Sequence, residues 1–392
     1  MDNFQQMEKK NINGDIIIKE DEEQSSSSSI NGDILVSILS FLPLLDLISA
    51  SQVSKSWNRA VFFSLHRLKS IPWLFIYNQR NFPPYTMATT SMTYDPISNH
   101  WIKLKTESPY QHISVIRSSH STLLYALSPA KFSFSIDAFH LIWRHVAPLR
   151  VWRVDPIVAV IGSRLVIAGG VNEFEDDRLA VELFDLDNGN EWERCESMPE
   201  FLYGSGSSTW LSVAVSFEKM YVTEKRSGLA CCFDLETRSW TNLLDLCPGE
   251  DCRVYSRVIG FVGDRLIMAG ITGDEDNPTG IEFWEVEMMR SIGSMPKECF
   301  DKLRGIGGSD WPLTSITMNA VGDMVYVYDT TVVGDIVAAE MEDGKLCKWR
   351  SLRNADAKWN KSHAVEKRIV ACSIVDFSDL TRAFKDNLSF ST

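Results

Sequence analysis

Basic residues are scarce in this chain. Its 392 residues include 39 Lys and Arg against 52 Asp and Glu, which gives a formal net charge of -13. Proteins that bind nucleic acids start from a basic surface that neutralises phosphate groups. The deficit of basic residues therefore argues against a nucleic-acid binder and favours partners of another kind.

Long apolar runs and a secretory signal are also missing. The longest apolar run near the start, Ile34 to Leu45, covers 12 residues, whereas a membrane-spanning helix needs about 20. The N-terminus lacks the basic start, apolar core and small-residue cleavage site of a signal peptide. We therefore predict a protein without membrane contact that stays in the cytoplasm, the nucleus or both.

Enzyme motifs do not occur either. We find no Gly-x-Ser-x-Gly, His-Glu-x-x-His, phosphate-binding loop or dinucleotide glycine fingerprint. The seven histidines show no paired metal-ligand spacing, and the eight cysteines form no dense framework. We predict no catalytic residues, no metal and no cofactor.

The sequence does contain enough apolar material for a large core, since 44% of its residues are hydrophobic and 23% are charged. The first 29 residues differ, because they are polar and acidic and end in five serines, Ser25 to Ser29. Such a segment has too little apolar surface to offset the entropy of ordering. We predict a disordered tail over residues 1–29.

Residues 30–70 predict three short helices. Apolar residues recur at helical spacing from Ile34 to Leu42, between Asp33 as a candidate cap and Pro43 as a stop. Two further apolar clusters follow within the segment. A helical unit of about 40 residues cannot bury so many leucines by itself. Part of its surface must be covered by a partner or by the rest of the chain.

The same segment resembles the F-box. The pair Leu42-Pro43, the pair Asp46-Leu47 and the string Val-Ser-Lys-Ser-Trp from Val53 to Trp57 match the family pattern in order and spacing. The resemblance implies a docking surface for the Skp-type adaptor of cullin-RING ubiquitin ligases. The residues that it assigns to adaptor binding are Leu35, Ile38, Leu39, Leu42, Pro43, Leu47, Val53 and Trp57.

The pattern changes to short strands over residues 71–384. Segments such as RLVIAGGV (164–171) and MVYVYD (324–329) are rich in β-branched and aromatic residues and lie between turn residues. We predict one all-β domain over this range and a short C-terminal tail over residues 385–392.

This domain is repetitive. In four units an Asp closes a strand and a Trp opens the next: Asp95 and Trp101, Asp137 and Trp143, Asp185 and Trp192, and Asp234 and Trp240. These tryptophans lie 42, 49 and 48 residues apart, close to the length of about 50 residues of a kelch propeller blade. Units of this length predict a β-propeller of about six four-stranded blades.

The units resemble the kelch repeat, in which a Gly pair follows a strand and a Trp comes later. Gly169-Gly170 with Trp192 is the best copy in the chain, and Ala269-Gly270 is a partial one. Together with the F-box, these repeats make the chain similar to the F-box/kelch-repeat family of plants. The related F-box-associated β domain has the same repeated Asp and Trp residues, which we call the Asp and Trp marks. It remains the alternative fold.

The C-terminal stretch RIVACSIVDFSDLTRAF (368–384) predicts a last strand followed by a short helix. We expect this strand to close the ring by pairing beside Trp73 to Tyr77, because propellers limit exposed sheet edges by closure.

Two acidic insertions between strands, VNEFEDDR (171–178) and ITGDEDNPTG (271–280), are the candidate binding loops. Acidic loops at one rim would favour a target protein with a basic patch; the alternative is that they only keep the propeller soluble. The candidate substrate-binding residues are Glu173, Glu175, Asp176, Asp274, Glu275 and Asp276.

The resemblance as a whole implies a substrate receptor of an SCF-type ubiquitin ligase. The F-box would dock the Skp-type adaptor and, through it, the cullin-RING ligase, while the propeller would bind a target protein. The chain would supply proximity and orientation and would itself make no covalent bond. Two alternatives stay open: an interaction scaffold outside any ligase, and a propeller hydrolase or oxidase, which bound metal would support.

Overall fold

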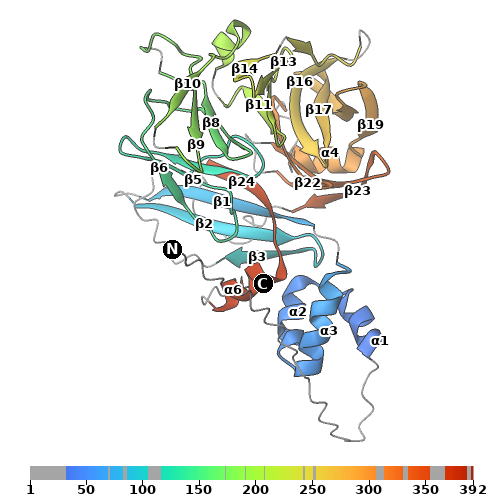
Figure 1. Cartoon of the computed structure of the whole chain (residues 1–392). Coiled ribbons are helices and arrows are strands. Elements are labelled where there is room, and N and C mark those ends of the chain that lie inside the picture. Colours follow the sequence, from blue (N-terminus) through green and yellow to red (C-terminus); the bar gives the residue numbers. More distant parts are fainter. Residues whose placement is uncertain are drawn as a thin grey trace, which may run out of the picture.

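Three short helices come first in the structure, a computed structural model, and a ring of six β-sheets follows (Figure 1). The structure describes residues 32–68, 71–82, 86–104, 116–172, 174–189, 191–206, 208–241, 243–249, 253–305, 313–329, 334–353, 367–385 and 390–391. The tail predicted over residues 1–29 lies outside these ranges. The prediction of a small helical F-box followed by a six-bladed propeller is confirmed.

The helices are α1 (Gly32–Leu39), α2 (Leu44–Ser51) and α3 (Lys55–Leu65). Pro43 separates the first two, as expected from its missing N–H group, while Asp33 lies inside the first turn of α1. Ser54 caps α3 by accepting a hydrogen bond from the backbone N–H of Trp57 at 3.2 Å. The Ser and Trp of the F-box string therefore have a local role in starting the third helix.

The sheets follow one another along the chain. The first contains β1 (Pro72–Phe82), β2 (Thr86–Asp95) and β3 (His100–Leu104), with β24 (Lys367–Ile374) and β25 (Phe390–Ser391); the second contains β4 (Leu124–Leu127), β5 (Phe132–Ser135) and β6 (Arg144–Val146). The third contains β7 (Ile157–Ile161), β8 (Arg164–Ala168), β9 (Val181–Asp185) and β10 (Glu193–Cys195). In the second sheet a single bridge between Arg117 and Tyr125 stands in place of the innermost strand.

The fourth sheet contains β11 (Leu211–Val215), β12 (Lys219–Glu224), β13 (Leu229–Asp234), β14 (Ser239–Trp240) and β15 (Leu244–Asp245). The fifth contains β16 (Val254–Val262), β17 (Arg265–Asp274), β18 (Asn277–Glu285) and β19 (Arg290–Ser294), and the sixth β20 (Ile316–Val321), β21 (Met324–Asp329), β22 (Ile336–Glu342) and β23 (Lys345–Leu352). Short helices η1 (Glu200–Ser205) and α4 (Lys297–Leu303) lie in two connections between blades.

The Asp and Trp marks have one geometry in successive blades. Asp185 accepts hydrogen bonds from the backbone N–H groups of Asp187 and Asn188 at 2.9 and 3.1 Å. These bonds close the turn between the third and fourth strands and hold the pKa of Asp185 below its usual range. Trp192 then packs on Phe184 with ring centroids 5.2 Å apart. The same turn bonds occur at Asp95, Asp137 and Asp234.

The ring closes through the C-terminal strand. β24 pairs antiparallel with β1, with Leu74 opposite Cys372 and Phe75 opposite Ala371. It is the innermost strand of the first blade, because Asn319 of the sixth blade donates a hydrogen bond to the carbonyl of Val370 at 3.1 Å. The expected pairing of this strand beside Trp73 to Tyr77 is confirmed.

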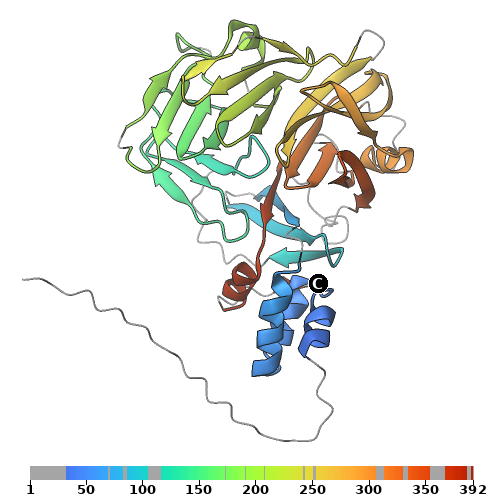
Figure 2. The ribbon, with the colours of Figure 1, turned by 45° about the vertical axis from the view of Figure 1, so that its right-hand side comes forward.

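Helix α6 (Phe377–Lys385) follows β24 and joins the helical unit to the ring. Leu380 and Ala383 are fully buried in the apolar cluster that also contains Leu47 of α2 and Phe75 of β1. Figures 1 and 2 both show α6 beside the N-terminal helices, at the edge of the first blade. Part of the apolar surface of the helical unit is therefore covered by its own chain.

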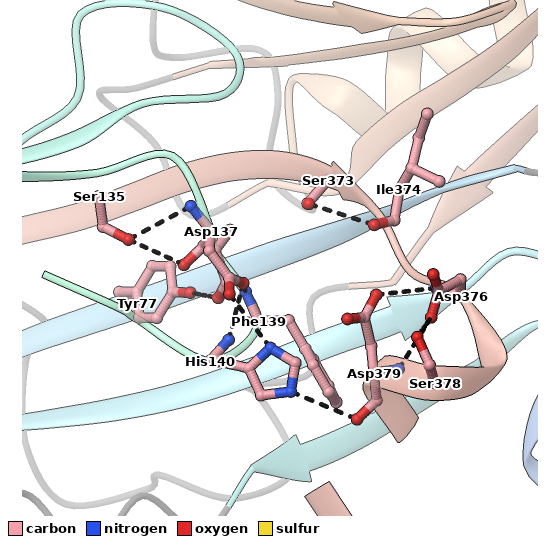
Figure 3. Close-up of polar contacts among 11 residues, drawn as sticks. Tyr77, Ser135, Asp137, Phe139, His140, Ser373, Ile374, Asp376, Ser378 and Asp379 are labelled. Atoms are coloured by element: carbon pink, nitrogen blue, oxygen red, sulfur yellow. Dashed lines mark hydrogen bonds and ion pairs between the residues drawn. The ribbon is translucent and has the colours of Figure 1, made fainter. Parts of the chain in front are cut away.

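A polar cluster attaches α6 to the second blade (Figure 3). His140 lies between the two elements, with Nδ1 3.1 Å from Oδ2 of Asp137 and Nε2 3.3 Å from the carbonyl oxygen of Asp379. The hydroxyl of Tyr77 donates to the carbonyl of Ala138 in the same turn. The turn that carries one of the Asp marks thus also positions the C-terminal helix.

Shortening the chain at its C-terminus tests the importance of this closure. A chain that ends at residue 366 loses β24 and α6, and we expect it to lose cooperative thermal unfolding, because the first blade is left without its inner strand. A chain that ends at residue 385 keeps both elements and serves as the control. We expect its midpoint of thermal unfolding to stay within a few degrees of that of the full chain. Cooperative unfolding of the shorter chain at the full-length temperature would contradict this role.

Candidate interaction surfaces

An apolar stripe on the first helix is exposed. Ile34 and Ile38 of α1 and Phe41 directly after it have 55%, 50% and 84% of their surface exposed. Their spacing of four and three residues places them on one side of the helix. Exposed apolar side chains in a continuous row mark a contact surface more often than isolated ones do. We call Ile34, Ile38 and Phe41 the α1 stripe.

The residues predicted to bind an adaptor divide into two groups. Leu35, Leu39 and Leu47 are 6%, 1% and 0% exposed, so they hold the three helices together rather than forming a free surface. Ile38 and Val53 are exposed, whereas Leu42, Pro43 and Trp57 are half-buried.

The predicted set contained Ile38 of the α1 stripe together with the buried Leu35 and Leu39, and it missed Ile34 and Phe41. Phe62 and Phe63 of α3, which are 60% and 58% exposed, were also missed. The 3.6-residue period shows that α1 has an apolar side, but apolar residues lie on both of its sides here. A closer count of both sides would have found Ile34 and Phe41.

The two acidic insertions lie on the same face of the ring. Residues 171–178 belong to the connection from β8 to β9, and residues 271–280 span the turn from β17 to β18, so both join the second to the third strand of a blade. The second insertion is mostly strand, because β17 runs to Asp274 and β18 begins at Asn277. We call the face with the second-to-third connections (169–180, 225–228 and 275–276) and the connection 196–210 the upper face.

The opposite, lower face carries the turns from the first to the second strand (162–163, 216–218, 263–264 and 322–323). β1 begins and β24 ends at this face, so α1 to α3 and α6 attach there and the described upper face is free of them.

The predicted acidic residues differ in their partners. Glu275 pairs with Arg226 at 3.2 Å, and Asp274 lies 3.9 Å from Arg253. Glu175, Asp176 and Asp276 are exposed, and no ion pair to another described residue is found for them. Glu173 lies outside the described residues. Three acidic side chains are thus available on the upper face.

A buried arginine anchors the first acidic connection. The guanidinium of Arg153 donates to the carbonyls of Gly169 and Ala180 at 2.6 and 2.8 Å, and it pairs with Glu182 at 3.0 Å. Arg153 is fully buried and Glu182 nearly so. Both ends of the connection are therefore bound to one side chain, which sequence analysis missed because Arg153 and Glu182 are far apart in the chain.

The Gly pair of the kelch repeat, Gly169-Gly170, lets this connection pack closely against the backbone before β7. Gly169 and Gly170 have φ of 61° and 64°, which other residues rarely adopt. A Cβ atom on Gly170 would lie 2.4 Å from the backbone of Asp155 and Pro156. Only glycine allows the backbone before β7 to lie against this turn.

A cavity of about 260 Å³ lies on the ring axis, at the lower face. It is lined by His120 and by residues of the inner strands, among them Val160, Ala214 and Gly260. Burial lowers the pKa of His120 to about 4, and its Nε2 has no hydrogen-bond partner in the described part of the chain. The imidazole is therefore neutral at pH 7, and the lining carries no charged side chain.

The described residues hold no group of three His, Cys, Asp or Glu side chains placed to bind a metal ion. Among the described helices, none has the length and apolar character that a membrane crossing requires.

Comparisons with known proteins agree with this two-part architecture. Residues 33–68, which contain α1 to α3, match the family model described as F-box-like. A protein of Arabidopsis thaliana named as an F-box/kelch-repeat protein is 71% identical to this chain over 373 residues, which cover 93% of this chain and 94% of the relative. The similarity extends over the helical unit and the propeller together.

The Arg153 anchor can be tested by stability measurements. Arg153→Met removes the charged partner of the buried carboxylate of Glu182, and we expect the free energy of unfolding to fall by about 3–5 kcal/mol. Arg150→Met is the matched control, because Arg150 pairs with Glu191 on the exposed surface at 3.3 Å; its cost should stay below about 1 kcal/mol. Urea denaturation measures both, and equal costs would show that Arg153 is no anchor.

The buried imidazole of His120 should make stability depend on pH. In the unfolded chain His120 takes up a proton as the pH falls through 6.5, whereas in the folded chain it does so only near 4. Folding is thus weakened as the pH falls from about 6.5 to about 4, by at most about 1.4 kcal/mol per pH unit for this one group. We expect the unfolding free energy of the natural chain, measured relative to that of His120→Gln, to fall as the pH falls over this range. If the unfolding free energies of the two chains ran parallel between pH 7 and pH 4.5, this expectation would be contradicted.

Proposed function

Because this chain belongs to the F-box/kelch-repeat family, we propose that it is the substrate-recognition subunit of an SCF-type ubiquitin ligase. F-box/kelch proteins are in general non-catalytic adaptors. In this proposal α1 to α3 dock a Skp-type adaptor, and through it the cullin-RING ligase, while the propeller binds a target protein. The chain acts in the cytoplasm, the nucleus or both, and needs no cofactor.

The α1 stripe is the observation that carries the adaptor-binding part. Water-exposed Ile34, Ile38 and Phe41 are apolar at i, i+4 and i+7, which is the spacing of a helix that lies against another apolar surface. Leu35 and Leu39, one position further along the helix, keep α1 on α3 and so present the stripe outward. Val53, Phe62 and Phe63 add exposed apolar surface on the same small unit.

The shape of the molecule supports a receptor role for the propeller. In Figure 1 the sheets that contain β8 to β10 and β16 to β17 lie at the far end of the ring from α1 to α3. A target bound to these blades would not compete for space with an adaptor on the helices. Since α6 packs against both parts, the two binding sites keep a defined orientation. Such a receptor accelerates ubiquitin transfer to its target by raising the effective concentration of the target near the ligase.

Substitution in the α1 stripe tests adaptor docking. We expect the double variant Ile38→Asp, Phe41→Asp to lose at least tenfold in capture of a co-expressed, purified Skp-type adaptor, because two carboxylates would be buried in the contact. Both side chains are exposed in the free chain, so the melting temperature should change little. Capture is measured by affinity pull-down with stoichiometry read from the gel.

Two further variants separate docking from folding. Phe217→Asp changes an exposed Phe of the propeller, 81% exposed, and should capture the adaptor as the natural chain does. Leu39→Asp puts a carboxylate into the core of the helical unit and should also lower the melting temperature. Undiminished capture by the double variant would reject the α1 stripe as the docking site. No capture by the natural chain would reject the ligase role and favour an interaction scaffold.

A further inference from the structure

Four large aromatic side chains are exposed on the upper face, over the third and fourth blades. Trp152, Phe174, Tyr203 and Trp210 have 45%, 87%, 54% and 52% of their surface exposed. They come from three connections: 147–156 before β7, 169–180 between β8 and β9, and 196–210 before β11. The Asp and Trp marks do not include any of them, so they are not required by the repeat.

Backbone hydrogen bonds hold these three connections together. Val154 donates to the carbonyl of Gly170 at 2.7 Å, and Gly170 donates to the carbonyl of Gly206 at 2.7 Å. The carboxylate of Asp155 accepts from the hydroxyl of Ser208 at 2.8 Å and from the backbone N–H of Thr209 at 3.1 Å. Asp155, three residues after Trp152, is thus bound to the two residues that precede Trp210. The aromatic side chains stand on one connected platform rather than on separate loops.

Exposed aromatic residues are costly to keep in water and are enriched where proteins bind one another. Each of these four presents a large apolar face with few rotatable bonds, so little conformational entropy is lost when a partner covers it. The guanidinium of Arg178 lies over the ring of Tyr203 at 5.3 Å from its centroid, which restricts that side chain further. The platform is suited to receive apolar side chains of a partner.

The exposed charge at the edge of the platform next to Phe174 is negative. Glu175 and Asp176 directly follow Phe174 and form no ion pair with other described residues. The arginines nearby are already engaged, since Arg194 pairs with Asp177 at 2.7 Å and Arg226 with Glu275 at 3.2 Å. Free carboxylates next to apolar surface favour a partner with Lys or Arg beside apolar residues.

We propose that the surface formed by Trp152, Phe174, Tyr203 and Trp210, with Glu175 and Asp176 at its edge, binds a segment of the target protein in which apolar side chains are flanked by Lys or Arg. This inference rests on the proposed function and specifies the class of target. A second copy of this chain would bring the same acidic groups into the contact and be repelled. The chain's own N-terminal segment, residues 1–29, has seven acidic and three basic residues, so its net charge is negative and it is disfavoured for the same reason.

The test uses the purified full chain and three fluorescent twelve-residue peptides. The first has Leu and Trp at its centre between Lys and Arg, the second replaces Lys and Arg by Glu and Asp, and the third replaces Leu and Trp by Ser and Gly. We expect fluorescence anisotropy to show at least tenfold tighter binding of the first peptide than of the other two. Binding should weaken as salt is raised from 50 to about 300 mM, because the charge contribution is screened.

Variants of the chain assign the binding to the platform. Phe174→Ser together with Trp210→Ala should weaken binding of the first peptide at least tenfold, and Glu175→Gln together with Asp176→Asn should reduce the dependence on salt. Phe217→Ser is the matched control, since Phe217 is 81% exposed in a turn of the lower face. It should bind the peptide as the natural chain does.

The inference is overturned if the first peptide fails to bind, if the acidic peptide binds as well, or if Phe217→Ser has the same effect as the platform variants. Adaptor capture by each variant is measured in parallel. Capture of the adaptor without selective peptide binding would reject this class of target and leave the ligase role standing. Selective peptide binding without adaptor capture would reject the ligase role and leave the platform standing.

Discussion

The pairing of β24 with β1 is the contact on which the rest of this structure depends. The first blade has no inner strand until residues 367–374 supply it, and Trp73 and Ser373 then lie opposite each other. Joining segments so far apart in the chain costs loop entropy, which many blade-to-blade contacts must offset together. In the described part of the chain the inner strands of neighbouring blades form no ladder with each other. Single hydrogen bonds link blades instead: the backbone N–H of Ala320 donates to the hydroxyl of Ser121, and that of Cys372 donates to the carbonyl of Ser121. One circular core results rather than six independent sheets.

The same contact positions the helical unit. β1 begins shortly after α3, and β24 leads directly into α6, so both connections between helices and ring lie at the first blade. Leu47, Phe75 and Leu380 come from three distant segments and share one buried cluster. Because buried side chains pack at the density of organic crystals, such a junction resists bending. The distance and direction between the α1 stripe and the upper face are therefore properties of the fold.

In the propeller, the residues that build the blades are distinct from the residues exposed on the upper face. The Asp turn and its Trp recur in the first four blades, whereas the fifth uses Glu285, which pairs with Arg290 at 2.7 Å, and has Met289 where a Trp is expected. The connections on the upper face do not contain the repeated Asp and Trp. They carry exposed aromatic and acidic residues instead. Binding surfaces arise in such connections because a rigid scaffold fixes their ends, as Arg153 does for the connection from β8 to β9.

The amino-acid sequence by itself determined the two-part architecture, the three helices, the blade repeat and the closing strand, because caps, turns and the periods of helix and strand are local properties. It did not decide which side of α1 is free: Ile38 and Leu39 are neighbours and equally apolar, yet one is half exposed and the other buried. It also did not reveal the pairing of Arg153 with Glu182, the neutral His120 on the axis, or the gathering of Trp152, Phe174, Tyr203 and Trp210. Each of these depends on which distant segment packs alongside, and only the tertiary structure decides that.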